Sequence, residues 1–119
     1  NRAWHVRDEL DLEAMAKAAG YLKGTHYFRA FCASGHQNRT FERTITYSAW
    51  TFQGDILCYD TKGNGFLYNM VRIMTGAMVD IGRGRYPPEV ILEAFETGDR
   101  NTLGMTAPAM GLYLVEVFY

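Results

Sequence analysis

The sequence predicts an α+β domain in which a mainly antiparallel sheet has helices packed on one face. Three observations lead to this prediction. Apolar residues repeat at helical spacing near the start of the chain, two runs of strand formers flank a tight turn, and two more helical patterns precede a last strand-like run. With 119 residues, 48% of them hydrophobic and 21% charged, the chain suits a single domain over residues 1–119.

The first predicted helix begins after Asp11, a residue type that caps helices, and runs to about Leu22. Gly24 is expected to end it in a left-handed turn. Its apolar stripe has the period of a helix and comprises Leu12, Met15, Ala16, Ala19 and Leu22. Residues 25–39 show no clear period, so we predict a docked loop with room for one helical turn.

Residues 43–52 and 56–62 are rich in strand formers, and the turn at residues 53–55 predicts that they pair as a hairpin. Residues 63–65, which read Gly-Asn-Gly, end the sheet. The main helix is predicted over residues 66–81. Its core side holds Phe66, Leu67, Met70, Val71, Met74, Ala77, Met78 and Ile81.

A further helix is predicted to start at Pro87-Pro88 and to close at Gly98, because proline suits a first helical turn and glycine a helix end. The residues expected to pack inward are Val90, Ile91, Ala94 and Phe95. Those expected to face water are Glu89, Glu93 and Glu96. A loop over residues 99–111 then leads to a final strand over residues 112–119.

Composition excludes several classes of protein. The only cysteines, Cys32 and Cys58, are too few for a disulfide scaffold and fit reduced, buried or half-buried thiols in a cytoplasmic protein, with a single disulfide between them as the alternative. The longest apolar stretch has 16 residues, fewer than the ~20 that span a bilayer, so we expect no membrane segment. The net charge of −1 means that a polyanion would have to meet a local basic patch. The missing initiator methionine suggests a trimmed chain.

No common catalytic motif is visible. The chain lacks a P-loop, a dinucleotide fingerprint and metal-ligand spacing. The carboxylates Asp60, Asp80 and Asp99 have no nearby base and are interpreted as caps or surface charges. The three histidines lie on separate segments and are more typical of structural or solvent-facing positions: His5, His26 and His36.

Arg72 breaks the pattern of its surroundings, because it lies within the most apolar part of the chain. A guanidinium there needs either water or an anionic partner. Its neighbours at helical spacing form a polar, small stripe of Tyr68, Asn69, Thr75 and Gly76. One interpretation is a surface arginine on the wet side of the helix. The other is an arginine aimed at a carboxylate or phosphate in a cleft.

Residues 23–43 are basic and aromatic, with Glu42 as their only acid. Nucleic-acid grooves combine cations with aromatic platforms in this way. The simpler interpretation is a solvated loop whose aromatic side chains turn inward, and composition alone favours it.

Three segments together resemble the TruA family of tRNA pseudouridine synthases. Residues 63–72 (GNGFLYNMVR), with the later Gly76, Gly82 and Gly84, resemble a motif of that family. Residues 107–119 look like its closing strand, and residues 24–31 with Arg39, Thr40 and Arg43 are similar to its basic segment. The resemblance runs in order over nearly the whole chain.

The resemblance implies an enzyme that isomerises uridine to pseudouridine in the tRNA anticodon stem-loop, without cofactor or metal, as a cytoplasmic homodimer. Arg72 would be the active-site arginine that pairs with the catalytic aspartate, and a cation there keeps a carboxylate ionised and oriented. Leu112 would form the active-site wall against a flipped base. The RNA-binding residues would be His26, Arg39, Arg43, Lys62 and Asn64.

The family's catalytic aspartate lies in an R-T-D-A-G-V-H motif, which this sequence does not contain. Asp60 does not replace it, because its surroundings match nothing in that motif. We therefore interpret the chain as the C-terminal half of such a synthase, inactive alone and partnered by the N-terminal half. The alternatives are a non-catalytic RNA-binding or dimerisation module and a small-molecule binding domain, which would leave Arg72 unexplained.

Overall fold

The structure is a computed structural model that describes residues 10–32, 40–53, 56–67, 69–103 and 116–118. Its elements, in chain order, are α1 (Leu12–Leu22), β1 (Gly24–Tyr27), the 3-10 turn η1 (Arg29–Phe31), β2 (Glu42–Gln53), β3 (Ile56–Gly63), α2 (Met70–Gly82), α3 (Val90–Thr97), the 3-10 turn η2 (Arg100–Thr102) and β4 (Glu116–Phe118).

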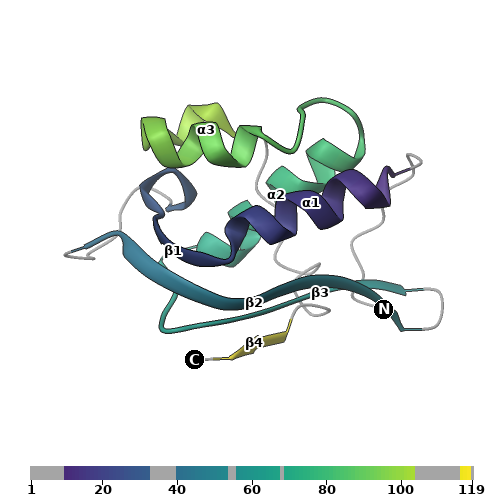
Figure 1. Cartoon of the computed structure of the whole chain (residues 1–119), viewed down its shortest axis with the longest axis horizontal. Helices are drawn as coiled ribbons and strands as arrows, with labels where there is room; N and C mark the ends of the chain where they lie inside the picture. Colours follow the sequence, from purple (N-terminus) through teal and green to yellow (C-terminus); the bar gives the residue numbers. More distant parts are fainter. Residues whose placement is uncertain (1–9, 33–39, 54–55, 68, 104–115, 119) are drawn as a thin grey trace.

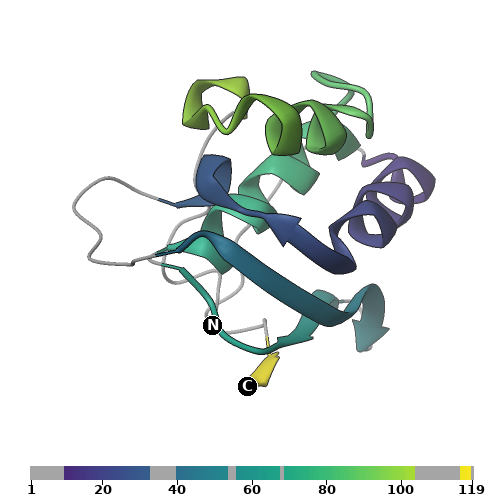
Figure 2. The ribbon, with the colours of Figure 1, turned by 60° about the vertical axis from the view of Figure 1, so that its left-hand side comes forward.

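The strands form one sheet in the order β1-β2-β3-β4. The first three strands pair antiparallel, and β4 runs parallel to β3. All three helices lie on the same side of β2 and β3 (Figure 1), and the turned view agrees (Figure 2). The predicted α+β class, a mainly antiparallel sheet with helices on one face, is confirmed.

The predicted hairpin is confirmed as β2 and β3, which pair from Gln53 opposite Ile56 back to Ile45 opposite Gly63. Side chains alternate between the two faces of a strand. On the helix-covered face, Ser48 and Tyr59 are buried, and the Trp50 indole lies 3.2 Å from the Met78 sulfur of α2.

Helix α1 begins as predicted, because the Asp11 carboxylate accepts a hydrogen bond from the Ala14 amide at 3.1 Å. The predicted apolar stripe is partly wrong. Leu12 is 39% exposed and Ala16 is also exposed, whereas Ala18 is buried. The buried residues follow the spacing of one helix face, turned slightly from the predicted one, and are Met15, Ala18, Ala19 and Leu22.

Residues 24–32 are more regular than the predicted loop. Gly24, with φ +104°, opens strand β1, which pairs with β2, and η1 supplies the one helical turn. The inward-facing aromatic interpretation is confirmed for Phe28 and Phe31, which are fully buried and whose rings contact Phe95 of α3, but it is wrong for Tyr27, which is 47% exposed. Backbone pairing with β2, which periodicity does not reveal, makes this segment a strand.

Helix α2 starts at Met70 rather than at Phe66, because Asn69 takes a left-handed conformation with φ 59° that no helix continues. Every residue of α2 except Arg72 is buried. Helix α2 lies beside α1 over the sheet, and α3 lies on the side of these two helices that is away from the sheet (Figure 1). The expected wet stripe is therefore wrong for Thr75 and Gly76, which α2 buries with its apolar residues.

Asp80, interpreted from the sequence as a cap or surface charge, is only 1% exposed near the end of α2. Its carboxylate lies 3.6 Å from the Arg83 guanidinium and 3.7 Å from that of Arg85. The Asp80 carbonyl also accepts a hydrogen bond from the Arg85 amide at 3.0 Å. The prediction missed this burial because both arginines follow the helix in the loop that turns back over it.

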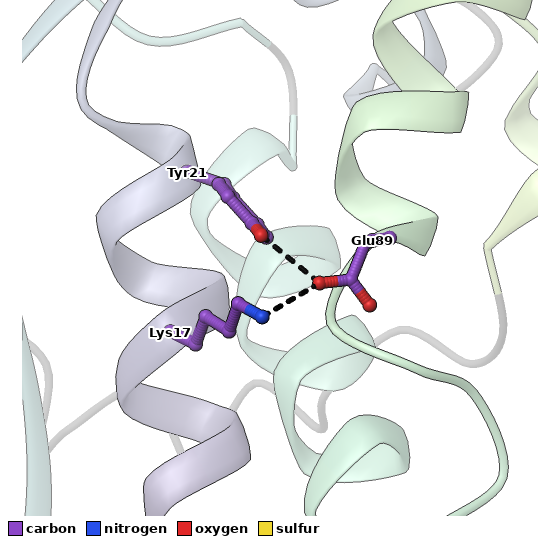
Figure 3. Close-up of polar contacts among 3 residues, drawn as sticks. All are labelled: Lys17, Tyr21 and Glu89. Carbon is purple, nitrogen blue, oxygen red and sulfur yellow. Dashed lines mark hydrogen bonds and ion pairs between the residues drawn. The ribbon is translucent and has the colours of Figure 1, made fainter.

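Helix α3 follows Pro87-Pro88 and ends at Gly98 with φ 63°, as predicted. Its first turn is joined to α1 on the surface (Figure 3). One Glu89 carboxylate oxygen lies 3.0 Å from the Lys17 ammonium and accepts a hydrogen bond from the Tyr21 hydroxyl at 2.9 Å. These hydrogen bonds lower the pKa of Glu89 and raise the pKa of Lys17. The Lys17–Glu89 ion pair is solvent-exposed, so it contributes little to the free energy of unfolding.

Tyr59 provides a test of the core. Burial raises the pKa of its hydroxyl to about 12, although hydrogen bonds with Ser48 and Thr61 oppose the shift. Because the pKa of the Tyr59 hydroxyl is higher in the folded than in the unfolded protein, its contribution to the free energy of unfolding is fully present below pH 10. That contribution is lost as the pH rises through about 12. At about pH 11 the free energy of unfolding is expected to be lower by about 1 kcal/mol.

Urea titrations at about pH 9 and about pH 11 measure this loss, with Tyr59→Phe as the matched control that cannot ionise. We expect the wild type to lose more stability than the variant over that interval. Equal losses in the two proteins would show that the Tyr59 hydroxyl does not ionise on unfolding.

Cys32 and Cys58 are buried free thiols, as predicted. Of the predicted last strand, residues 116–118 are described and confirmed as β4, and the other residues of that strand lie outside the described residues. Within the described ranges, no helix is long and apolar enough to cross a bilayer. Those same ranges contain no group of three or more potential metal-ligating side chains.

Candidate functional site

Arg72 is the residue of α2 whose side chain lies partly outside the core. It is half-buried, and the other twelve residues of this 13-residue helix are all buried. One nitrogen of its guanidinium donates a hydrogen bond to the Asn69 amide oxygen at 3.1 Å. Arg72 is not part of a wider exposed stripe, because the other residues of α2 are buried, and both interpretations of its half-buried side chain stay predictions. A cation held at the rim of an apolar helix suits recognition of an anion.

The segment that leads from the sheet into α2 is fastened to β2 by Asn64. The side-chain oxygen of Asn64 accepts a hydrogen bond from the backbone amide of Thr44 at 2.9 Å. The backbone amide of Asn64 donates to the backbone carbonyl of Thr44 at 3.0 Å. Just before it, Gly63 leaves no room for a side chain, because a Cβ there would lie 2.7 Å from the same carbonyl. Asn64 is exposed, but its amide oxygen serves the fold.

Arg43 lies beside this segment, since a Cβ on Gly65 would be 3.6 Å from the Arg43 Nε. The Arg43 guanidinium donates to the carbonyls of Thr40 and Glu42, at 2.9 and 2.7 Å. These contacts hold the cation against its own strand. The structure thus brings two predicted RNA-binding residues, Arg43 and Asn64, to one end of the β2–β3 pair.

Lys62 and Tyr47 lie opposite each other on β3 and β2. Both are exposed, and the Lys62 ammonium lies 5.7 Å from the centre of the Tyr47 ring. Because their neighbours Ser48 and Thr61 are buried, alternation places this pair on the sheet face away from the helices. A cation beside an exposed ring suits stacking and phosphate contacts.

His26 has a different environment from the other predicted RNA-binding residues. One ring nitrogen lies 2.7 Å from the Lys23 carbonyl oxygen. The ring stacks on Phe95 of α3, with centroids 4.2 Å apart and planes 8° apart. These contacts give His26 a packing role on the helix side of β1. Its contact with RNA stays a prediction.

Two of the predicted site residues, Arg39 and Leu112, lie outside the described residues. Asp60 lies on β3 between Ala49 and Glu116, and one of its carboxylate oxygens is buried without a hydrogen bond. No base contacts it among the described residues, which agrees with leaving it out of the chemistry. Sequence reasoning gave no separate role to Asn69, although asparagine just before a helix is a known sign of a cap or a left-handed turn.

Comparison with known proteins identifies the family. A family model described as tRNA pseudouridine synthase matches residues 18–119. The chain is 49% identical over 112 residues to tRNA pseudouridine synthase A of Syntrophomonas wolfei, an alignment that covers 94% of this chain and 45% of the relative. It is 47% identical over 117 residues to the Moorella thermoacetica protein of the same name, covering 98% and 48%.

The tRNA pseudouridine synthase A of Acetivibrio thermocellus is 44% identical over 119 residues, which are 100% of this chain and 49% of the relative. The chain spans about half the length of the curated relatives it matches. The family model covers most of the chain, including α2 with Arg72 and the sheet strands β1 to β4. This chain therefore belongs to the tRNA pseudouridine synthase family.

Proposed function

We propose that this chain forms one wall of a tRNA pseudouridine synthase active site that isomerises uridine in the anticodon stem-loop. The observation that carries the proposal is Arg72, a half-buried cation at the rim of an otherwise buried helix. It stands in the sequence segment that resembles the family's motif, in a chain whose family is established. Leu112 would supply apolar contact to the base.

The reaction breaks the bond between C1′ of the ribose and N1 of uracil and forms a bond from C1′ to C5. The proton on C5 is released to solvent and N1 takes up a proton from solvent, so atoms and charge balance. A carboxylate assists this chemistry only while it is ionised and correctly oriented. Arg72 would provide both, because a guanidinium favours the charged form of a neighbouring carboxyl and binds it in a fixed plane.

The carboxylate itself would come from the other half of the protein. Three observations support this part of the proposal. The chain contains no R-T-D-A-G-V-H motif, it spans about half of its relatives, and Asp60 has no catalytic partner among the described residues. We propose that this chain is the C-terminal half and is inactive without the N-terminal half.

Binding of tRNA would depend on two cations, Arg43 at the sheet end and Lys62 on the sheet face away from the helices, together with Arg39, Asn64 and His26. Contacts to phosphates release counterions, so the affinity should fall as the salt concentration rises. The flipped uridine would enter the cleft between the two halves. The family resemblance is also the basis for proposing a homodimer in the cytoplasm.

Release of tritium from tRNA labelled at uridine C5 tests the function. We expect release when this chain and a separately produced N-terminal half are mixed, and none from either half alone. Release by this chain alone would show that one of its own carboxylates acts, and Asp60→Asn would identify it. Salt-dependent tRNA binding without release in any mixture would favour the non-catalytic RNA-binding module instead.

A further inference from the structure

We propose that Asn69 is a positioning residue that holds the Arg72 guanidinium in its working orientation. The inference rests on the proposed function, because it gives Asn69 a task only if Arg72 orients a carboxylate. The contact that suggests it is the hydrogen bond of 3.1 Å from the Arg72 guanidinium to the Asn69 amide oxygen.

The backbone of Asn69 is unusual. Among the described residues it is the one non-glycine residue with a positive φ, at φ 59° and ψ 13°. L-residues avoid this left-handed region, asparagine tolerates it best after glycine, and such conformations gather at functional sites. Glycine would fit the backbone with less strain, so the presence of an asparagine points to a use for its side chain.

That use is not helix capping. An asparagine at this position normally accepts a hydrogen bond from the backbone amide two or three residues later. Asn69 makes no such bond. The residue three positions later is Arg72, and the amide oxygen accepts from its guanidinium instead of from its backbone. The start of α2 therefore has no side-chain cap, and the Asn69 amide oxygen serves the Arg72 guanidinium as a hydrogen-bond acceptor.

The turn that presents this acceptor is anchored in the core. The Met70 amide donates to the Leu67 carbonyl at 3.0 Å, and the Ile73 amide donates to the Asn69 carbonyl at 3.0 Å. Leu67, Met70 and Ile73 are all buried, at 3%, 0% and 0% exposed. Because buried residues hold the turn on both sides, the backbone of Asn69 is fixed, and its side chain extends from a fixed point toward Arg72.

The Asn69 oxygen, as a hydrogen-bond acceptor on one edge of the Arg72 guanidinium, limits the rotation of that guanidinium. The fork geometry of arginine is useful for binding a carboxylate only when its plane is set in advance. Asn69 would set that plane without touching substrate. It would thereby raise kcat, with little effect on the affinity for tRNA.

The test compares Asn69→Gly and Asn69→Asp in the full-length synthase. Glycine keeps the left-handed backbone and removes the acceptor, whereas aspartate keeps an oxygen in the same place and tolerates the same backbone. We expect Asn69→Gly to lower kcat by roughly 10- to 100-fold, with the KM for tRNA and the melting temperature close to wild type. Asn69→Asp should retain a higher kcat per folded molecule than Asn69→Gly.

A matched control is Asn101→Gly, which changes an exposed asparagine in η2 and should leave kcat unaltered. A structural role for Asn69 predicts the reverse order, in which glycine is at least as active as aspartate, and that order would overturn the inference. Wild-type kcat in Asn69→Gly would overturn it too. If Asn69→Gly is fully active while Arg72→Ala is inactive, only this inference fails. If Arg72→Ala is fully active, the role of Arg72 in the proposed function fails.

Discussion

Replacement of Arg72 by alanine in the full-length synthase is expected to lower kcat by a factor on the order of 100 to 1,000. The loss follows from removing the guanidinium that would keep the catalytic carboxylate ionised and oriented. Affinity for tRNA should change little, because Arg72 is one half-buried cation and the proposed phosphate contacts are made by other residues. Folding should persist because the other twelve residues of α2 stay buried.

Single-turnover tritium release, tRNA filter binding and thermal melting measure these three quantities. Arg72→Lys separates charge from geometry, since lysine keeps the charge but lacks the planar fork, and it should recover only part of the activity. Arg85→Ala is a matched control, because Arg85 has a 61% exposed side chain and follows α2. If melting of Arg72→Ala accounts for its lost activity, Arg72 is structural and its proposed role is wrong.

The largest effect on stability is expected for Asp80→Ala, which should lower the free energy of unfolding by about 3 kcal/mol. The Asp80 side chain is 2% exposed and that of its partner Arg83 is 15% exposed, so the pair is mostly removed from water. Removing the carboxylate leaves the Arg83 charge in a poorly solvated place. The estimate is at the low end for buried pairs because Arg83 keeps some access to solvent.

Urea denaturation of Asp80→Ala and Arg85→Ala measures this difference. Arg85 is the exposed partner of Asp80, at 3.7 Å, and its removal should cost less than about 1 kcal/mol. A loss for Asp80→Ala as small as that for Arg85→Ala would contradict this prediction. It would show that the Arg83 charge is already well solvated in the folded protein.

Patterns in the sequence predict most of the secondary structure, because local chemistry encodes it. The Asp11 cap, the β2–β3 hairpin and the helix between Pro88 and Gly98 are all where residue type and spacing place them. Each of these depends on a few neighbouring residues, and a short window of sequence contains them. The same holds for the last strand, of which residues 116–118 are described.

Elements that depend on distant partners were predicted less well. Strand β1 forms because β2 pairs with it, and the start of α2 is set by the left-handed turn at Asn69. The stripe of α1 turned because Ala18 faces its packing partners while Leu12 does not. For β1 and α1 the competing interaction comes from a segment outside the window that a periodic pattern covers. The start of α2 is set locally by the backbone conformation of Asn69, which the apolar period does not encode.

The candidate site divides in the same way. The sequence by itself singled out Arg72 and its family motif, because a charge within an apolar run is visible in one dimension. It also determined the fold class and the absence of a recognisable catalytic aspartate motif. Only the tertiary structure decided that α2 is buried on every side except at Arg72, and that Asn69 turns its amide oxygen to the guanidinium. Burial and side-chain direction arise when the sheet and the other two helices pack around α2, and no local pattern encodes them.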